Sequence, residues 1–250
     1  MNDQSDKSKL SDQYIGKESR SAKGFRNFVI VILAAIPIMG ATIYFEDRYS
    51  LSKEIETTTT HQNDSILTIG IIGDSWVSNQ KLDSLFNSAA NVVISSGEPG
   101  AKSKKIYQNL CANTELLTKA DFCIVIAGVN DVIGNMGTNY YSNHILLITK
   151  KLLSCGIEPI LVPVPDFGVD ETRKRLNIIS KFRNYISYLF IGKQEPSDYR
   201  ESISNLYSAY PVDFKADYKT NPELYANPSH LSDKGNIELC KAIMKANKSK

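Results

Sequence analysis

The sequence has little of what zinc-binding and nucleic-acid-binding proteins contain. Only four of its 250 residues are cysteines, and no two of them stand at the close spacing of a zinc-ligand pair. The 29 basic and 27 acidic residues leave a formal net charge of +2, and the basic residues are scattered, so nothing indicates a nucleic-acid partner. An α/β domain of this size needs no disulfide, and we predict no pairing among the cysteines. These are Cys111, Cys123, Cys155 and Cys240.

Charge is absent from one long stretch near the N-terminus. Residues 1–27 are polar and nearly free of large apolar side chains, which predicts a disordered tail. The next 18 residues, 28–45, carry no charge and are just long enough to cross a bilayer. Lys23 and Arg26 precede this run and two acidic residues follow it, so the positive-inside rule predicts a cytoplasmic N-terminus and an external remainder.

Other readings of residues 28–45 fit less well. A cleaved signal peptide would have a shorter leading region and a better cleavage site than Met39-Gly40-Ala41. A buried core helix would show a polar face, whereas Pro37 and Gly40 interrupt a run that has none. No cysteine stands just after the run, so a lipoprotein anchor is not indicated.

Beyond a polar, Thr-rich tether at residues 46–65, apolar runs and amphipathic segments alternate through a domain predicted at 66–250. Such alternation is typical of βαβ units, and it predicts a three-layer α/β/α sandwich with a parallel sheet. The predicted strands begin at Ile66 and then cover 91–95, 121–127 and 158–163, and the predicted helices cover 77–90, 102–117 and 140–155. In the less regular last third, helices are predicted at 170–190, 197–208 and 232–246.

Polar side chains follow several of these strands. Ser75 comes directly after the first strand, where ligands bind in open α/β sheets. By itself Gly-Asp-Ser is also a plain strand-to-helix turn with a capping serine, and the spacing of a nucleophile elbow is missing. The loop from Ser96 to Gly100 follows the second strand, Asn130 follows the third, and His230 precedes the last helix. Together they supply a hydroxyl nucleophile, an imidazole base and oxyanion donors.

In this order and spacing, the motifs GDSW, the glycine loop, GVND and HLSDKG resemble those of the SGNH (GDSL-like) hydrolases over roughly 66–246. The resemblance implies a flavodoxin-like fold, with Ser75 as nucleophile and His230 as base. It implies an oxyanion hole of the Ser75 N–H, Gly100 and the Asn130 side chain, with Gly97 as the second choice for the glycine. It implies no metal and no diffusible cofactor.

The sequence departs from that family at position 227, where the family usually has aspartate and this chain has Asn227. In serine proteases such a change lowers turnover by about 10⁴, chiefly through the wrong histidine tautomer. Either Asn227 orients His230 in a Ser-His dyad, which we favour, or Asp217 or Glu223 supplies the carboxylate. Asp233 is better explained as a first-turn charge on the last helix.

The leading hypothesis is a membrane-anchored, externally facing serine esterase that removes acetyl or another short acyl group from a cell-envelope carbohydrate. An O-acyltransferase would use the same acyl-enzyme and pass the acyl group to a sugar hydroxyl. A catalytically silent glycan-binding or assembly protein would keep only the fold. The other histidines, His61 and His144, are assigned no chemistry.

Overall fold

The computed structural model describes residues 35–42, 67–78, 82–86, 90–209 and 212–248. The chain divides into two units, Met1–Thr42 and Ile43–Lys250. In the first, residues 35–42 form a short helix in which the Thr42 hydroxyl donates to the Ile38 carbonyl at 2.9 Å. No helix within the described ranges is both long and apolar enough to cross a bilayer. The predicted tail and tether, and most of the predicted membrane segment at 28–45, lie outside these ranges.

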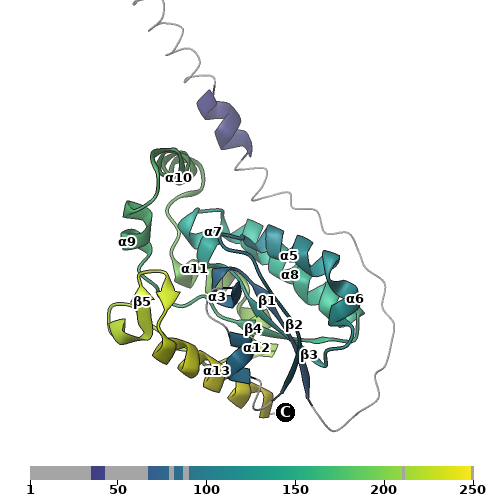
Figure 1. Cartoon of the computed structure of the whole chain (residues 1–250). Coiled ribbons are helices and arrows are strands. Elements are labelled where there is room, and N and C mark those ends of the chain that lie inside the picture. The colour runs from purple at the N-terminus through teal and green to yellow at the C-terminus, as the bar shows by residue number, and fades with distance from the viewer. Residues whose placement is uncertain (1–34, 43–66, 79–81, 87–89, 210–211, 249–250) are drawn as a thin grey trace, which may run out of the picture. The chain divides into compact units, whose positions relative to one another are not determined.

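Four parallel strands in the order β2-β1-β3-β4 form the sheet of the second unit (Figure 1). They are β1 (Thr68–Gly73), β2 (Asn91–Gly97), β3 (Phe122–Ile126) and β4 (Glu158–Val162). The central strands are apolar because helices cover both faces of the sheet, as expected for parallel strands. Ile71 and Ile124, which lie side by side in the β1–β3 register, are at most 1% exposed. The predicted α/β fold with a parallel sheet is confirmed.

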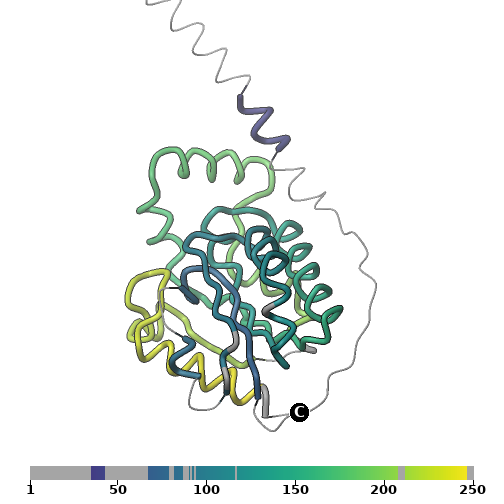
Figure 2. Tube along the Cα trace, turned by 45° about the vertical axis from the view of Figure 1, so that its right-hand side comes forward, coloured from purple at the N-terminus to yellow at the C-terminus, as the bar shows by residue number. Residues whose placement is uncertain are grey.

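The helices that cover the sheet lie in two layers. On one face are α5 (Ser103–Ala112), α6 (Thr114–Leu117) and α8 (Thr138–Ser154). On the other are α3 (Ser75–Ser78), α4 (Leu82–Phe86) and α13 (Asp233–Lys248). Figures 1 and 2 both show the yellow α13 across the sheet from the teal α5 and α8. The short α7 (Val129–Ile133) follows β3 directly.

Strand order makes the carboxyl end of β1 the natural place for a site. The chain moves outward from β1 to β2 on one side and then returns to β3 on the other. Loops leaving β1 and β3 therefore diverge at this topological switch point, where open α/β sheets bind their ligands. Ser75 follows β1 and Asn130 follows β3.

Several segments predicted as single helices are divided. Residues 170–190 contain α9 (Val169–Lys174) and α10 (Ile178–Ile191), because Asn177 caps a new helix by accepting a hydrogen bond from Ser180 N at 2.8 Å. Residues 197–208 are likewise split into α11 (Pro196–Ser202) and α12 (Ser204–Ala209). Asn113, which ends α5, separates it from α6.

A small hairpin precedes the last helix and was not predicted. After the 3₁₀ turn η1 (Pro222–Leu224), strands β5 (Tyr225–Asn227) and β6 (His230–Leu231) pair antiparallel. Both residues expected from the C-terminal motif, Asn227 and His230, stand on it and face each other in the register.

Candidate active site

Ser75 stands on a tight turn between β1 and α3. The Asp74 carbonyl accepts hydrogen bonds from the N–H groups of Val77 and Ser78 at 3.1 and 3.3 Å, and an Asp74 carboxylate oxygen accepts from Trp76 N at 3.0 Å. Among the described residues, no hydrogen bond uses the Ser75 N–H. At the first position of a helix this N–H has no intrahelical acceptor, so it is available to a ligand.

The His230 side chain reaches Ser75 from the hairpin. Its Nε2 lies 2.9 Å from the Ser75 Oγ, across 155 residues of sequence. The indole N–H of Trp76 donates to the Ser229 carbonyl at 2.8 Å, which ties the hairpin to the turn that carries Ser75. Trp76 is fully buried. The nucleophile and base candidates are therefore held together by the residues next to each of them.

Asn227 fixes the orientation of the imidazole. Its Oδ1 lies 3.1 Å from His230 Nδ1 and also accepts the backbone N–H of Ser229 at 3.0 Å. A backbone N–H can only donate, so the amide atom that faces Nδ1 must be the oxygen. The imidazole then carries its proton on Nδ1, and Nε2 is left with a lone pair toward Ser75. An Asn in this arrangement selects the tautomer that a general base requires.

The two carboxylates considered as alternatives are engaged elsewhere. Asp217 Oδ1 accepts from Lys219 N at 2.8 Å, and Glu223 lies 3.3 Å from the Lys234 ammonium. Within the described part of the chain, no hydrogen bond or ion pair joins either of them to His230. Burial lowers the pKa of His230 below its ordinary 6.5, because desolvation disfavours the charged imidazolium.

Asn130 connects the turn at Ser75 with the loop after β2. Its side-chain nitrogen donates to Asp74 Oδ2 and to the Ala101 carbonyl, both at 3.1 Å. The Asn130 amide is thus fixed in position between the two segments that carry the other expected oxyanion donors. In this arrangement both amide hydrogens have acceptors, so a substrate oxyanion would share one of them.

The two glycines of the loop after β2 differ in role. A Cβ at Gly97 would lie 2.4 Å from Ser78 N, so this glycine allows β2 to pack against the backbone of α3. Gly100 is exposed, has φ +77°, and its missing Cβ would meet nothing within 4 Å. Its N–H donates no hydrogen bond within the described residues. Gly100 is therefore the better candidate for an oxyanion donor, and Gly97 is a packing residue.

Two buried carboxylates under the site were not found from the sequence. Asp74 and Asp131 are both fully buried. Burial raises the pKa of Asp74 to about 7, with a further contribution from the charge of Asp131, whose own pKa is raised by burial to about 6. Asp131 accepts from the N–H and hydroxyl of Ser103 at 2.9 and 2.7 Å and so anchors the start of α5. In the sequence they look like ordinary turn aspartates.

Beside the glycine loop the surface opens into a shallow pocket of about 290 Å³. Gly100 lines it together with Lys102, Lys104 and Lys105. Lys105 lies 3.6 Å from Glu98, so part of this charge is neutralised.

The remaining candidates have structural roles. His144 is buried in α8 with its Nδ1 2.7 Å from the Tyr140 carbonyl. Asp233 is the first residue of α13. All four cysteines are free thiols, and Cys123 is buried in β3. His61 lies outside the described residues.

No protein-family model and no curated protein matches this sequence. Among solved structures, the chain is similar to a lipase/acylhydrolase from Enterococcus faecalis, with 17% identity and a TM-score of 0.52 over 74% of this chain and 96% of that one. It is also similar to a GDSL-like lipase from Bacteroides thetaiotaomicron, with 16% identity and a TM-score of 0.50 over 73% and 89%. At such identities the likeness concerns the fold. The chain has the α/β fold of the GDSL-like, or SGNH, hydrolases.

Proposed function

We propose that this protein is a serine esterase that acts through an acyl-enzyme. The observation that carries the proposal is the line of contacts from Ser75 Oγ to His230 Nε2 at 2.9 Å and from His230 Nδ1 to Asn227 Oδ1 at 3.1 Å. A hydroxyl, a base in the required tautomer and a group that orients the base are the parts that nucleophilic catalysis on an ester needs.

In the proposed reaction, Ser75 Oγ attacks the ester carbonyl carbon while its proton passes to His230 Nε2. The carbonyl oxygen becomes an oxyanion that accepts hydrogen bonds from the N–H groups of Ser75 and Gly100 and from the Asn130 amide. The carbon–oxygen bond to the alcohol then breaks, and His230 returns the proton to the leaving oxygen. Water repeats the sequence on the acyl-enzyme and releases the acid.

The Asn130 side chain is expected to stabilise the oxyanion. Asn130→Ala should lower kcat by roughly 10²- to 10³-fold with a small change in KM, the usual cost of one oxyanion donor. Steady-state hydrolysis of p-nitrophenyl acetate by the full chain measures it. Asn139→Ala, an exposed asparagine on α8, is the matched control and should keep the wild-type rate. A kcat within a few fold of wild type in Asn130→Ala would contradict the role.

Activity is expected to persist into mildly acidic solution. His230 must be neutral to accept the serine proton, and burial lowers its pKa, so kcat/KM should fall only as the pH drops through a midpoint below 6.5. The same shift means that the folded protein takes up the His230 proton less readily than the unfolded chain, so this group reduces stability as the pH falls below about 6.5. A rate–pH profile measures the midpoint, and a value above 6.5 would contradict this assignment.

We infer further that residues 28–45 anchor the protein in a membrane and that the esterase domain faces outward, which rests on the charge-free run and on Lys23 and Arg26 before it. Protease added to intact spheroplasts should then digest the domain after residue 46 and spare the N-terminal tail. A domain that stays protected until the spheroplasts are lysed would overturn this orientation.

A short acyl group on a cell-envelope carbohydrate is the proposed substrate. It is supported by that location and by the open, polar pocket beside Gly100, which suits a hydroxyl-rich alcohol better than a long acyl chain. Product analysis with and without a sugar acceptor distinguishes release of free acid from transfer of the acyl group. Transfer that outpaces hydrolysis would assign the protein to the O-acyltransferases instead.

A further inference from the structure

Helix α10 turns most of its apolar side chains away from the protein, although one of them, Ile186, is fully buried. Ile178, Ile179 and Leu189 are 82%, 78% and 61% exposed, whereas Asn184 and Ser187, on the side that meets the domain, are 5% and 1% exposed. This is the reverse of an ordinary surface helix, which buries its apolar stripe. We call the exposed set the outer face of α10; it consists of Ile178, Ile179, Phe182, Tyr185, Leu189 and Phe190.

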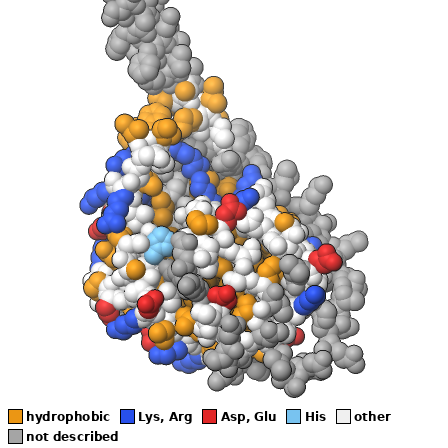
Figure 3. Space-filling view, in the orientation of Figure 1, with side chains coloured by type: hydrophobic (Ala, Val, Ile, Leu, Met, Phe, Trp, Pro, Cys, Tyr) orange, Lys and Arg blue, Asp and Glu red, His pale blue; other side chains and the backbone are white. Residues whose placement is uncertain are grey.

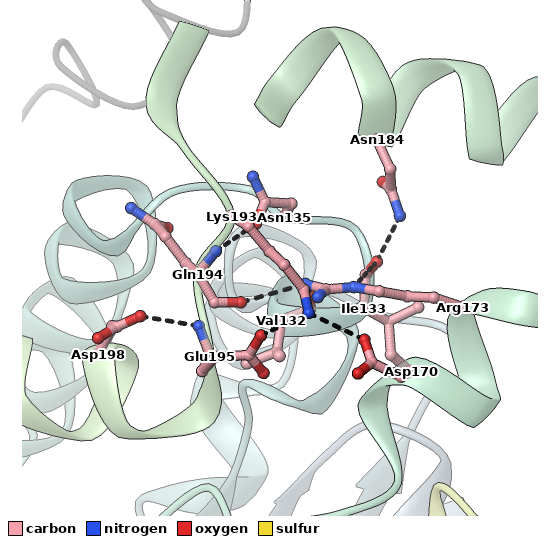
Figure 4. Close-up of polar contacts among 10 residues, drawn as sticks. All are labelled: Val132, Ile133, Asn135, Asp170, Arg173, Asn184, Lys193, Gln194, Glu195 and Asp198. Carbon is pink, nitrogen blue, oxygen red and sulfur yellow. Dashed lines mark hydrogen bonds and ion pairs between the residues drawn. The ribbon is translucent and has the colours of Figure 1, made fainter. Parts of the chain in front are cut away.

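A polar network holds the helix in this orientation. Asn184 Nδ2 donates to the Ile133 carbonyl at 2.8 Å, and the Ser187 hydroxyl donates to the Asn135 carbonyl at 2.6 Å. Asn135 Nδ2 donates back to the Ser187 oxygen at 2.9 Å. The Arg173 guanidinium donates to the Val132 carbonyl, and Figure 4 shows it beside Asn184. Rotating the helix to bury its apolar side would leave these buried polar groups unpaired, which is costly. These polar contacts therefore fix the orientation in which the apolar face of α10 points away from the domain.

The outer face lies on the same side of the domain as the candidate site. The carbonyls that support α10 belong to Ile133 and Asn135, shortly after Asn130 in the chain. Just before α9 begins, Gly168 N donates to the Pro228 carbonyl at 2.7 Å. Pro228 lies in the turn that precedes His230. Figure 1 shows α9 and α10 standing out from the body of the domain beside α7.

Basic side chains lie beside this face, in a segment that is flanked by Asp170, Glu171 and Glu195. Residues 172–194 contain six Lys or Arg residues and no Asp or Glu, in a chain whose formal net charge is only +2. Lys174, Arg175 and Lys181 are exposed, while Lys193 is paired with Asp170 and Glu195 at 3.0 and 2.9 Å. Figure 3 shows apolar side chains gathered at the top of the domain with Lys and Arg side chains below them.

We propose that the outer face of α10 docks into the surface of an anionic lipid bilayer. An apolar helix face with aromatic side chains and a basic border is what inserts at the boundary between headgroups and acyl chains. The basic border decides between occupants: a symmetric contact with a second copy would place like charges together, whereas anionic headgroups neutralise them. Docking would present the site beside α7 to substrates at the membrane surface.

The proposed anchor would assist docking but is not required for it. A tether of 20 residues (46–65) spans at most roughly 70 Å when extended, so it would keep the domain within reach of the bilayer. Esterase activity is not required either. The full-length Ser75→Ala protein should dock like wild type, so failure of docking and failure of the proposed function are separate results.

The single tryptophan of the chain allows a direct test. Trp76 is fully buried, so lipids with brominated acyl chains should not quench wild-type fluorescence. Full-length Tyr185→Trp, incubated with vesicles of phosphatidylcholine and phosphatidylglycerol, should show a blue shift and loss of emission with brominated lipid. Leu153→Trp is the matched control, since it changes an exposed apolar residue at the far end of α8 and should not be quenched.

The exposed basic residues beside the outer face of α10 allow a second test. In the Tyr185→Trp background, each of Lys174→Gln, Arg175→Gln and Lys181→Gln should lower the ratio of docked to undocked domain about fivefold on anionic vesicles. Pure phosphatidylcholine should give weak docking that these changes do not alter. Unquenched Tyr185→Trp fluorescence, equal quenching of Leu153→Trp, or a blue shift that follows dimer formation without lipid would each overturn the proposal. Unchanged thermal unfolding of each variant shows that α10 is still folded.

Discussion

Replacing Ser75 by alanine is expected to abolish ester hydrolysis by the full-length protein. Ser75 Oγ is the protein atom that forms a bond with the acyl group in the proposed reaction, and His230 Nε2 lies 2.9 Å from it in position to take its proton. In subtilisin, loss of the serine nucleophile lowers kcat by about 10⁶, so the rate of Ser75→Ala should fall to the background of the assay. Hydrolysis of p-nitrophenyl acetate measures the loss.

Covalent labelling provides the complementary measurement. A fluorophosphonate should react with the wild-type protein, and mass spectrometry of the digest should place the adduct on Ser75. Ser78→Ala is a matched control, because Ser78 stands on the same short helix and is exposed. It should keep both activity and labelling. Wild-type turnover in Ser75→Ala, or an adduct on another residue, would end the proposal of a serine esterase at this site.

Asn227→Asp is expected to raise turnover. The present Asn227 already selects the correct tautomer through the Ser229 N–H, so the charge of a carboxylate is the main thing that it lacks. A carboxylate at this distance should raise the pKa of His230, and the same interaction would stabilise the imidazolium of the transition state. The expected gain in kcat is on the order of 10- to 100-fold, well below the 10⁴ that includes a wrong tautomer.

The same variant should move the pH dependence. The acid midpoint of kcat/KM should shift upward with the pKa of His230 in Asn227→Asp. Asp74, whose pKa is about 7, is not in contact with Asn227, so a midpoint that belonged to Asp74 would stay in place. Asp217→Asn and Glu223→Gln serve as controls and should be neutral, because both side chains are bound elsewhere. Loss of activity in either of them, with the fold intact, would rule out the Ser-His dyad.

The fold could be predicted from the sequence because its strands are buried on both faces. Such strands appear as short apolar runs, and the amphipathic segments between them imply parallel crossover connections. The positions of Ser75 and Asn130 followed from the same pattern, since each comes directly after one of these runs. The divided helices were less predictable, because a polar cap such as Asn177 is also compatible with a continuous helix.

The details of the candidate site depended on contacts between distant parts of the chain. Three side chains were considered as partners of His230: Asn227, Asp217 and Glu223. The β5–β6 pairing and the Ser229 N–H bring Asn227 to the imidazole, and residue spacing alone shows neither contact. Likewise Asp74 becomes a buried acceptor for Asn130 only when β1 and β3 lie side by side.

The sequence by itself determined the parallel α/β architecture and the residues that follow its strands, because hydrophobic periodicity records which side chains share a face. It could not determine which face of α10 turns toward the domain. Periodicity marks an apolar stripe, and the usual inference buries that stripe. Only the tertiary structure shows that Asn184 and Ser187 pair with carbonyls of residues 133–135 and leave the apolar side exposed, because the cost of unpaired buried polar groups is set by partners distant in the sequence.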